Sequence, residues 1–131
     1  MIGIGEVYSS MSTNDIASAR AFYGDTLGLD AKVVALEGMG EMLWITHPGG
    51  AQTLVYPKED HVAATHTILN FVADDFDATM ADLRSRGVVF ETNDWTDEGG
   101  VARDPSGATP PRAWFRDPAG NWSSVSAKEL P

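Results

Sequence analysis

Residues 14–28 read NDIASARAFYGDTLG, and residues 74–87 read DDFDATMADLRSRG. Both stretches begin with a pair of Asn or Asp side chains, whose oxygens can accept hydrogen bonds from the free N–H groups of a first helical turn. Apolar residues then recur at helical spacing, and a glycine follows, which suits the positive φ that often ends a helix. The sequence therefore predicts helices over residues 16–27 and 76–86, in a chain that repeats one pattern twice.

Strand-like sequence surrounds both predicted helices. One segment precedes each helix and three follow it, with turn residues between them. The expected strands are residues 6–13, 31–36, 42–46, 53–56, 67–73, 88–92, 113–116 and 122–127. Residues 93–112 are the least regular segment, and connections of this length are typically functional lids or disordered loops.

These elements predict an α+β fold built from two tandem βαβββ modules. We expect the first module at residues 1–57, the second at residues 66–131, and a connector at residues 58–65. The chain of 131 residues has the length of one ordinary domain, and two independent cores of half that size would be marginal. We therefore expect a single domain, residues 1–131, that contains both modules.

The composition excludes several classes of partner. The chain has 9 Lys and Arg residues against 19 Asp and Glu residues, which gives a net charge of −10. Nucleic acids and anionic membrane surfaces require a dense cationic face, so neither partner is expected. No apolar run approaches the length of a membrane span, and the N-terminal sequence lacks the features of a signal peptide. The absence of cysteine excludes disulfides and thiolate chemistry and favours a reducing cytoplasm.

The stretch at residues 14–28 resembles the first helix of the vicinal oxygen chelate superfamily, which includes glyoxalase I, bleomycin-resistance proteins and extradiol dioxygenases. Residues 74–87 and the sequence WFRDPAGN at residues 114–121 match the same family in order, so the resemblance covers nearly the whole chain. It implies that the two modules form curved mixed sheets around a cleft that holds a metal or a small molecule. It also implies a homodimer.

The resemblance further implies four metal-ligand positions, where relatives use His, Glu or Gln. Carried over to this chain, these positions are Tyr8, Thr53, Ile68 and Ser124. Divalent transition metals prefer imidazole and carboxylate ligands, which none of these four side chains supplies. We therefore expect no metal and no cofactor at these positions.

Glu6 and His66 offer an alternative metal site. Each lies two residues before an implied ligand position, on the same face of its expected strand, displaced by about 6–7 Å. They could supply part of a non-standard site, or His66 could be an ordinary polar residue at the start of a strand. His47, in a turn, and His61, in the connector, are expected to be solvated.

Tryptophan is the more informative residue type. The four tryptophans on or beside expected strands are Trp44, Trp95, Trp114 and Trp122. An aromatic cleft without a metal suits a flat conjugated ligand, whereas the alternative is that some of these rings belong to the core. The candidate ligand-binding residues in the cleft are Tyr8, Trp44, Thr53, Ile68, Trp114, Trp122 and Ser124. Arg103, Arg112 and Arg116 could meet an anionic ligand or could offset the acidic residues around them.

The sequence thus predicts a metal-free binding protein that resembles the bleomycin-resistance branch and sequesters a small aromatic or drug-like molecule. The alternative is a superfamily enzyme of lyase, isomerase or dioxygenase type, which would use Glu6 and His66 with a metal, or Tyr8 in metal-free acid–base chemistry. No motif for a nucleophile or a phosphate-binding loop is present, so no catalytic residue is named. A regulatory domain is the third possibility, if the protein's own side chains fill the cleft.

Overall fold

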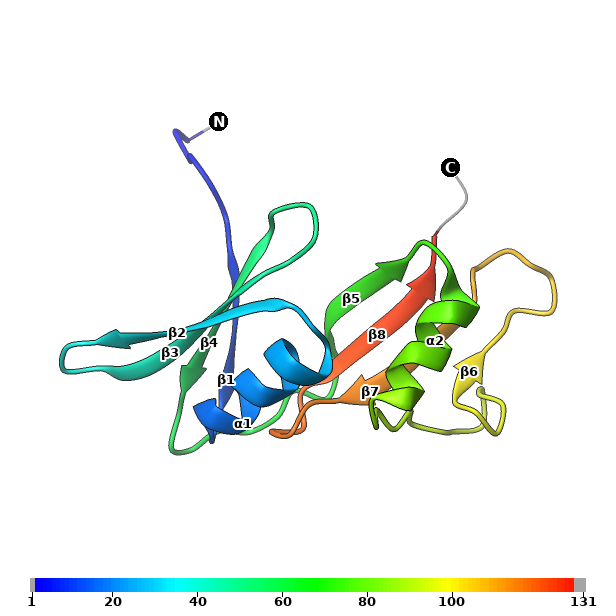
Figure 1. Cartoon of the computed structure of the whole chain (residues 1–131). Coiled ribbons are helices and arrows are strands. Elements are labelled where there is room, and N and C mark those ends of the chain that lie inside the picture. Colours follow the sequence, from blue (N-terminus) through cyan, green and yellow to red (C-terminus); the bar gives the residue numbers. More distant parts are fainter. Residues whose placement is uncertain (1, 129–131) are drawn as a thin grey trace. The chain divides into compact units, whose positions relative to one another are not determined.

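The structure is a computed structural model that describes residues 2–128. It divides into two compact units, residues 1–63 and 64–131 (Figure 1). Each unit contains a four-stranded mixed sheet and a helical segment, so the predicted α+β class and the tandem order of elements are confirmed. None of the helices within the described residues is long and apolar enough to cross a membrane.

The first unit has its strands in the spatial order β1-β4-β3-β2. Its elements are β1 (Ser9–Thr13), α1 (Ile16–Arg20), η1 (Ala21–Thr26), β2 (Asp30–Leu36), β3 (Gly40–Thr46) and β4 (Gln52–Pro57). β1 pairs with β4 in parallel, and the other two pairs are antiparallel. The largest fully buried side chains of this unit come from the helix and from the two central strands, and they include Tyr23, Leu43, Ile45 and Val55.

The helix ends follow from local residue chemistry. Asp15 and Asp75 each accept, through Oδ1, the backbone N–H of the residue three positions later, at 3.2 and 3.1 Å. Gly28 and Gly87 follow the helices with φ of 74° and 88°, as the sequence predicted. The last turn of the first helix, η1, is of π type, since the N–H of Leu27 donates to a carbonyl five residues earlier at 2.9 Å.

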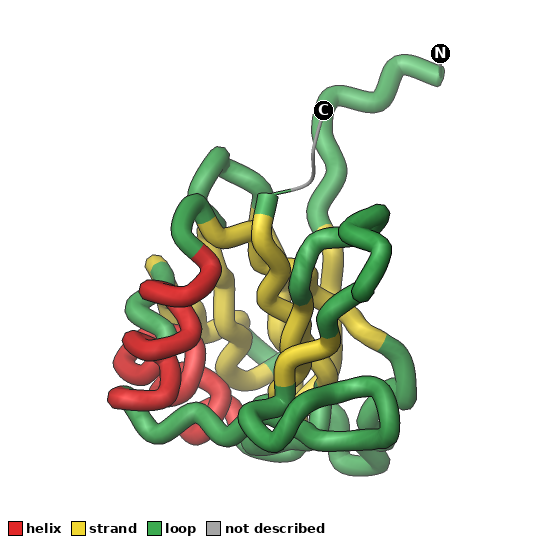
Figure 2. The backbone as a smooth tube through the Cα atoms, turned by 90° about the vertical axis from the view of Figure 1, so that its right-hand side faces the viewer, coloured by secondary structure: helices red, strands yellow, loops and turns green. Residues whose placement is uncertain are grey.

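The first strand is shorter than predicted. Residues 6–8 are exposed and belong to the loop that precedes β1 (Figure 2). Pairing begins at Ser9, opposite Thr53, because β4 begins only at Gln52 after the turn that follows β3. Residues 6–8 therefore have no partner strand in the described part of this sheet, and their backbone groups face water instead.

The second unit has its strands in the order β5-β8-β7-β6. Its elements are β5 (Thr67–Ala73), α2 (Phe76–Ser85), β6 (Val101–Ala102), β7 (Arg112–Arg116) and β8 (Trp122–Ala127). β5 and β8 are parallel, and the remaining pairs are antiparallel. Successive strand residues point to opposite faces, so the buried Phe115 and Val125 share one face, while Trp114, Trp122 and Ser124 share the other.

Residues 88–92 do not form the predicted strand. Val88 and Phe90 are buried and Val89 is exposed, which mimics the alternation of a strand. Only Phe90 makes a bridge, to Phe115 of β7. Arg112 and Ala113 of β7 pair with β6, a two-residue strand inside the segment that was expected to be irregular. Residues 88–92 and β6 therefore lie along the same edge of β7, which is too short for both to form full strands there.

Candidate ligand-binding site

Two pockets of the second unit share Trp95 and Trp114 and are therefore adjacent. The larger pocket has a volume of about 330 Å³, and its other lining residues are Ala102, Arg103, Asp104, Thr109, Pro110 and Arg112. The smaller pocket has a volume of about 200 Å³, and its other lining residues are Thr65, His66, Thr67, Asn93 and Trp122. We call the two pockets together the tryptophan groove. The larger volume lies within the range of small-molecule sites.

Strands β7 and β8 place Trp114 and Trp122 on the same face of the sheet. Trp114 pairs with Ser124, two residues along β8 from Trp122, so all three side chains point the same way. The guanidinium of Arg116 lies 5.0 Å from the ring centroid of Trp122, and its Nε donates to Glu91 Oε1 at 2.8 Å. This cation–π contact and ion pair favour one orientation of the Trp122 ring.

Trp95 comes from the irregular segment at residues 93–112, whose turns are held by side chains. Asn93 Oδ1 accepts the backbone N–H of Trp95 at 2.8 Å, and Asp97 Oδ1 accepts those of Gly99 and Val101, both at 2.9 Å. The Trp95 side chain lines both pockets although the residue is 82% exposed. A molecule bound in the groove would therefore cover apolar surface that is now in contact with water.

The larger pocket contains three charged side chains. Arg103 and Asp104 come from the irregular segment, and Arg112 comes from β7. The hydroxyl and the backbone N–H of Ser106 donate to Asp104 Oδ1 at 2.7 and 2.9 Å, and these bonds lower the pKa of the carboxyl group. Asp104 is thus ionised at neutral pH, and the pocket carries two positive charges against one negative charge.

Two predicted cleft residues of the second unit, Ser124 and Ile68, line neither of these pockets. Ser124 is fully buried, and its Oγ donates to Asn70 Oδ1 at 2.8 Å. Ile68 lies where the register between β5 and β8 shifts. Of the predicted set, the structure therefore brings Trp114 and Trp122 together in the tryptophan groove.

The first unit holds the other three predicted residues, on both faces of its sheet. The rings of Tyr8 and Trp44 meet edge to face, with centroids 5.0 Å apart. Thr53 pairs with Ile45, the residue next to Trp44 in β3, so its side chain points to the opposite face. The structure therefore joins Tyr8 to Trp44 and separates Thr53 from both.

Thr53 belongs instead to a polar cluster with Ser9 and His47. Its Oγ1 lies 2.8 Å from Ser9 Oγ and 2.8 Å from His47 Nε2. Burial lowers the pKa of His47, because the charged imidazole loses hydration. His47 was expected to be solvated, and it is half-buried, since its ring contacts the buried Thr53.

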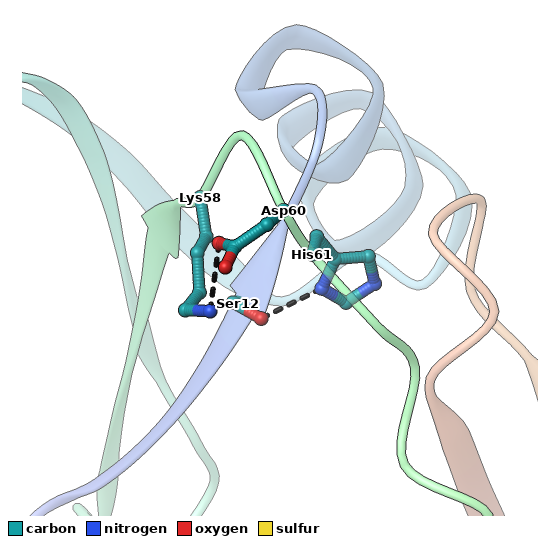
Figure 3. Close-up of polar contacts among 4 residues, drawn as sticks. All are labelled: Ser12, Lys58, Asp60 and His61. Atoms are coloured by element: carbon teal, nitrogen blue, oxygen red, sulfur yellow. Dashed lines mark hydrogen bonds and ion pairs between the residues drawn. The ribbon is translucent and has the colours of Figure 1, made fainter.

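His61 also has a partner within the first unit. Its Nδ1 lies 2.6 Å from Ser12 Oγ, and beside this pair Lys58 Nζ donates to Asp60 Oδ1 at 2.8 Å (Figure 3). A serine–histidine pair becomes a nucleophile when a carboxylate orients the ring, but the carboxylate of Asp60 binds Lys58 here. The contact between Ser12 and His61 attaches the connector to β1, and the four residues do not form a catalytic triad.

The residues at the implied metal positions do not fit a metal. Thr53 and Ser124 use their hydroxyl groups in hydrogen bonds to neighbouring side chains, and Ile68 has no donor atom. Among residues 2–128, no three His, Asp or Glu side chains lie close enough together to form a metal site. The alternative pair divides between the units: Glu6 lies in the exposed loop before β1, and His66 lines the smaller pocket.

Trp95, Arg103 and Arg112 were noted from the sequence as possible ligand contacts but were not included among the predicted cleft residues. The positions of Trp95 and Arg103 depend on the path of the irregular segment, which has no periodic pattern to reveal it, whereas Arg112 is the first residue of β7. A usable signal was present, since Asn and Asp side chains often bind the backbone N–H two residues later. Asn93 and Asp104 do so, and the first of these turns places Trp95 in the groove.

Comparisons with known proteins agree with this fold. A family model described as the Glyoxalase/Bleomycin resistance protein/Dioxygenase superfamily matches residues 7–125. A member of that superfamily from Sphaerobacter thermophilus DSM 20745 is 23% identical, with a TM-score of 0.72 over 95% of this chain and 98% of that one. TnmS3, an antibiotic binding protein from Streptomyces sp. CB03234, is 25% identical, with a TM-score of 0.70 over 98% of this chain and 100% of that one.

A lactoylglutathione lyase from Agrobacterium tumefaciens is also similar. It is 22% identical, with a TM-score of 0.67 over 94% of this chain and 92% of that one. None of the curated proteins matches the chain. The likenesses below 25% identity show the fold alone, whereas the family model matches most of the sequence.

Proposed function

The chain belongs to the glyoxalase/bleomycin resistance protein/dioxygenase superfamily, and from this premise we propose that it binds a small aromatic or drug-like molecule in the tryptophan groove. One observation carries the proposal: Trp95 and Trp114 line both pockets, and Trp122 lines the smaller one. Three indole rings around one groove suit a flat conjugated molecule, because aromatic pairs gain energy from stacking beyond the area they bury.

The exposure of Trp95 supports this proposal. An indole ring that is in contact with water and also lines a pocket gains roughly 25 cal/mol for each Å² of apolar surface that a ligand covers. The similarity to TnmS3, an antibiotic binding protein, points to the same class of function. We therefore propose that the bound molecule resembles an aromatic antibiotic and that the protein sequesters it.

We propose that binding uses no chelated metal, because the side chains at the family's ligand positions lack suitable donors. A homodimer and a cytoplasmic location are part of the same proposal. The dimer follows from the family resemblance, and the location from the absence of cysteine.

Ligand titration on a single-site variant tests the proposal. A panel of planar aromatic antibiotics would be titrated against the wild-type protein while tryptophan fluorescence and the melting temperature are measured. At least one compound should bind, and Trp95→Ala should weaken its binding about tenfold or more while changing the free energy of unfolding by less than about 0.5 kcal/mol, since the ring is exposed.

The matched control is Trp44→Phe, which alters a tryptophan of the first unit. It should keep wild-type affinity. The proposal fails if no compound of the panel binds, or if Trp95→Ala and Trp44→Phe weaken binding equally.

The position of His66 favours one alternative, an enzyme of the same superfamily. His66 lines the smaller pocket, where its imidazole could act as a general acid or base on a bound molecule. An enzyme would consume the bound compound, and His66→Gln would stop this reaction while leaving affinity within about twofold. Elemental analysis of the purified protein separates the metal-dependent form of this alternative from the metal-free form.

A further inference from the structure

The two ends of the tryptophan groove are lined by different kinds of residue. Trp95 and Trp114 belong to both pockets and therefore lie between them. Beyond them on one side lie His66, Asn93 and Trp122 of the smaller pocket, and on the other side lie the charged residues of the larger pocket. A ring held at the shared tryptophans thus has a polar and aromatic surface on one side and a surface with two arginines and an aspartate on the other.

The side chains that line the charged side include more arginines than acidic residues, although the protein as a whole is acidic. Arg103 and Arg112 line this side, in a chain with only 9 Lys and Arg residues and a net charge of −10. The acidic residue there is Asp104, whose two carboxylate oxygens accept hydrogen bonds from Ser106 and Thr109 of its own loop. Asp104 therefore holds the loop in shape, and the two guanidinium groups outnumber it.

The scaffold fixes one of these arginines and leaves the other adjustable. Arg112 lies on β7, paired with Ala102 on one side and Ser126 on the other, and its side chain is half-buried. Arg103 is exposed and follows β6 directly. A planar guanidinium matches a carboxylate with two parallel hydrogen bonds, which gives directional as well as electrostatic selectivity.

We propose that the ligand of the tryptophan groove is an aromatic carboxylate, with its ring at Trp95 and Trp114 and its carboxylate toward Arg103 and Arg112. This inference rests on the proposed function and names the chemical class of its ligand. It predicts that the groove discriminates by charge among molecules with the same ring.

Three naphthalene probes that differ in charge test this inference. Isothermal titration calorimetry at neutral pH would compare 2-naphthoate, the neutral 2-naphthamide and the cationic 2-naphthylmethylammonium. The naphthoate should bind about tenfold more tightly than the amide, because hydrogen bonds to an ionised group are about twice as strong as neutral ones. The ammonium probe should bind more weakly than the amide.

Arginine variants test whether the preference for the carboxylate probe comes from the two arginines of the groove. Arg112→Gln and Arg103→Gln should each reduce the preference for naphthoate over naphthamide to about threefold or less while keeping amide affinity. Arg86→Gln removes the same charge from an exposed ion pair with Asp82 and should keep the full preference. Arg103 is exposed, so its substitution remains informative if Arg112→Gln does not fold.

The outcomes distinguish a failure of this inference from a failure of the proposed function on which it rests. Equal binding of the acid and the amide, tighter binding of the ammonium probe, or a preference that survives both arginine substitutions would overturn the inference and leave an aromatic-binding groove. Failure of all three probes to bind would overturn the inference together with the aromatic site on which it rests.

Discussion

His47 Nε2 lies 2.8 Å from Thr53 Oγ1 at a half-buried position, and burial lowers the pKa of its imidazole below the ordinary value of 6.5. The unfolded chain therefore takes up a proton at pH values where folded His47 stays neutral. The contribution of His47 to the free energy of unfolding is then fully present above about pH 6.5 and is lost as the pH falls through the lowered pKa. We expect urea unfolding to show this loss between about pH 7 and pH 5.

The variant His47→Gln should flatten this part of the pH profile, because glutamine does not titrate. His66→Gln is the matched control, since it replaces an exposed histidine of the second unit. Carboxyl groups such as Asp97 and Asp104, whose pKa values are lowered by hydrogen bonds, act at more acidic pH and do not obscure the effect. Identical profiles for the wild type and His47→Gln would show that burial of this ring does not affect stability.

At the scale of elements, the segment 93–112 is packed and not a free loop. Gly100 is buried with φ of +84°, and a Cβ there would lie 2.7 Å from Phe90 Cβ and 2.9 Å from the Glu91 carbonyl oxygen. Gly107 in the same segment has φ of +73° but nothing within 4 Å of such a Cβ. A side chain at either glycine would strain the backbone, because φ is positive at both. Only at Gly100 would the added Cβ also collide with neighbouring atoms.

We therefore expect different effects from alanine at these two glycines. Gly107→Ala should lower the free energy of unfolding by about 1–2 kcal/mol, the usual cost of left-handed backbone in a residue with a side chain. Gly100→Ala should cost about 1–3 kcal/mol more, because the added methyl group forces apart the contact with residues 90–91. Urea unfolding of both variants measures the difference, and equal losses would mean that this contact does not hold the segment in place.

The structure also shows which elements can be predicted from sequence. Both helices and their Asp caps depend on residues close in sequence, and both predictions are confirmed. The turn at residues 117–121 is held by equally local contacts. Asp117 Oδ1, for example, accepts the backbone N–H groups of Ala119 and Asn121, both at 2.9 Å. β6 was missed because two residues carry no periodic pattern, and its identity depends on pairing with a strand that begins ten residues later.

Within the candidate site, too, some residue positions follow from local sequence pattern and others do not. Trp114 lies between two buried residues of β7, and its partner Ser124 lies two residues from Trp122 in β8, so the period of a strand places both tryptophans on one face. Trp95 enters the groove only because side-chain hydrogen bonds fold residues 93–112 toward that face. Thr53 was assigned on a strand without a rigid anchor in the sequence, and the structure places its side chain on the face opposite to Trp44, because it pairs with Ile45.

At the scale of the whole molecule, the exposed apolar side chains of strand β2 are better explained by a dimer than by a monomer. It is one of the two outer strands of the first sheet, and its side chains on both faces are exposed. Val33, Val34 and Leu36 are 41%, 37% and 41% exposed, and Met39 in the following turn is 63% exposed. An apolar outer strand is an aggregation hazard unless something covers it. A second copy of the chain would cover it and would fulfil the predicted homodimer.

Sedimentation of the full-length protein tests this prediction. The wild type should sediment as a dimer at micromolar concentration, and Val34→Lys should shift it to the monomer, because the lysine places a charge on each copy within the apolar contact. Val62→Lys, at a connector residue that is 85% exposed, should remain dimeric and controls for the added charge. Each copy carries a net charge of −10, so added salt should strengthen the dimer by screening repulsion. A wild-type protein that stays monomeric across these concentrations and salts would refute the dimer, whereas a dimer unaffected by Val34→Lys would place the contact elsewhere on the chain.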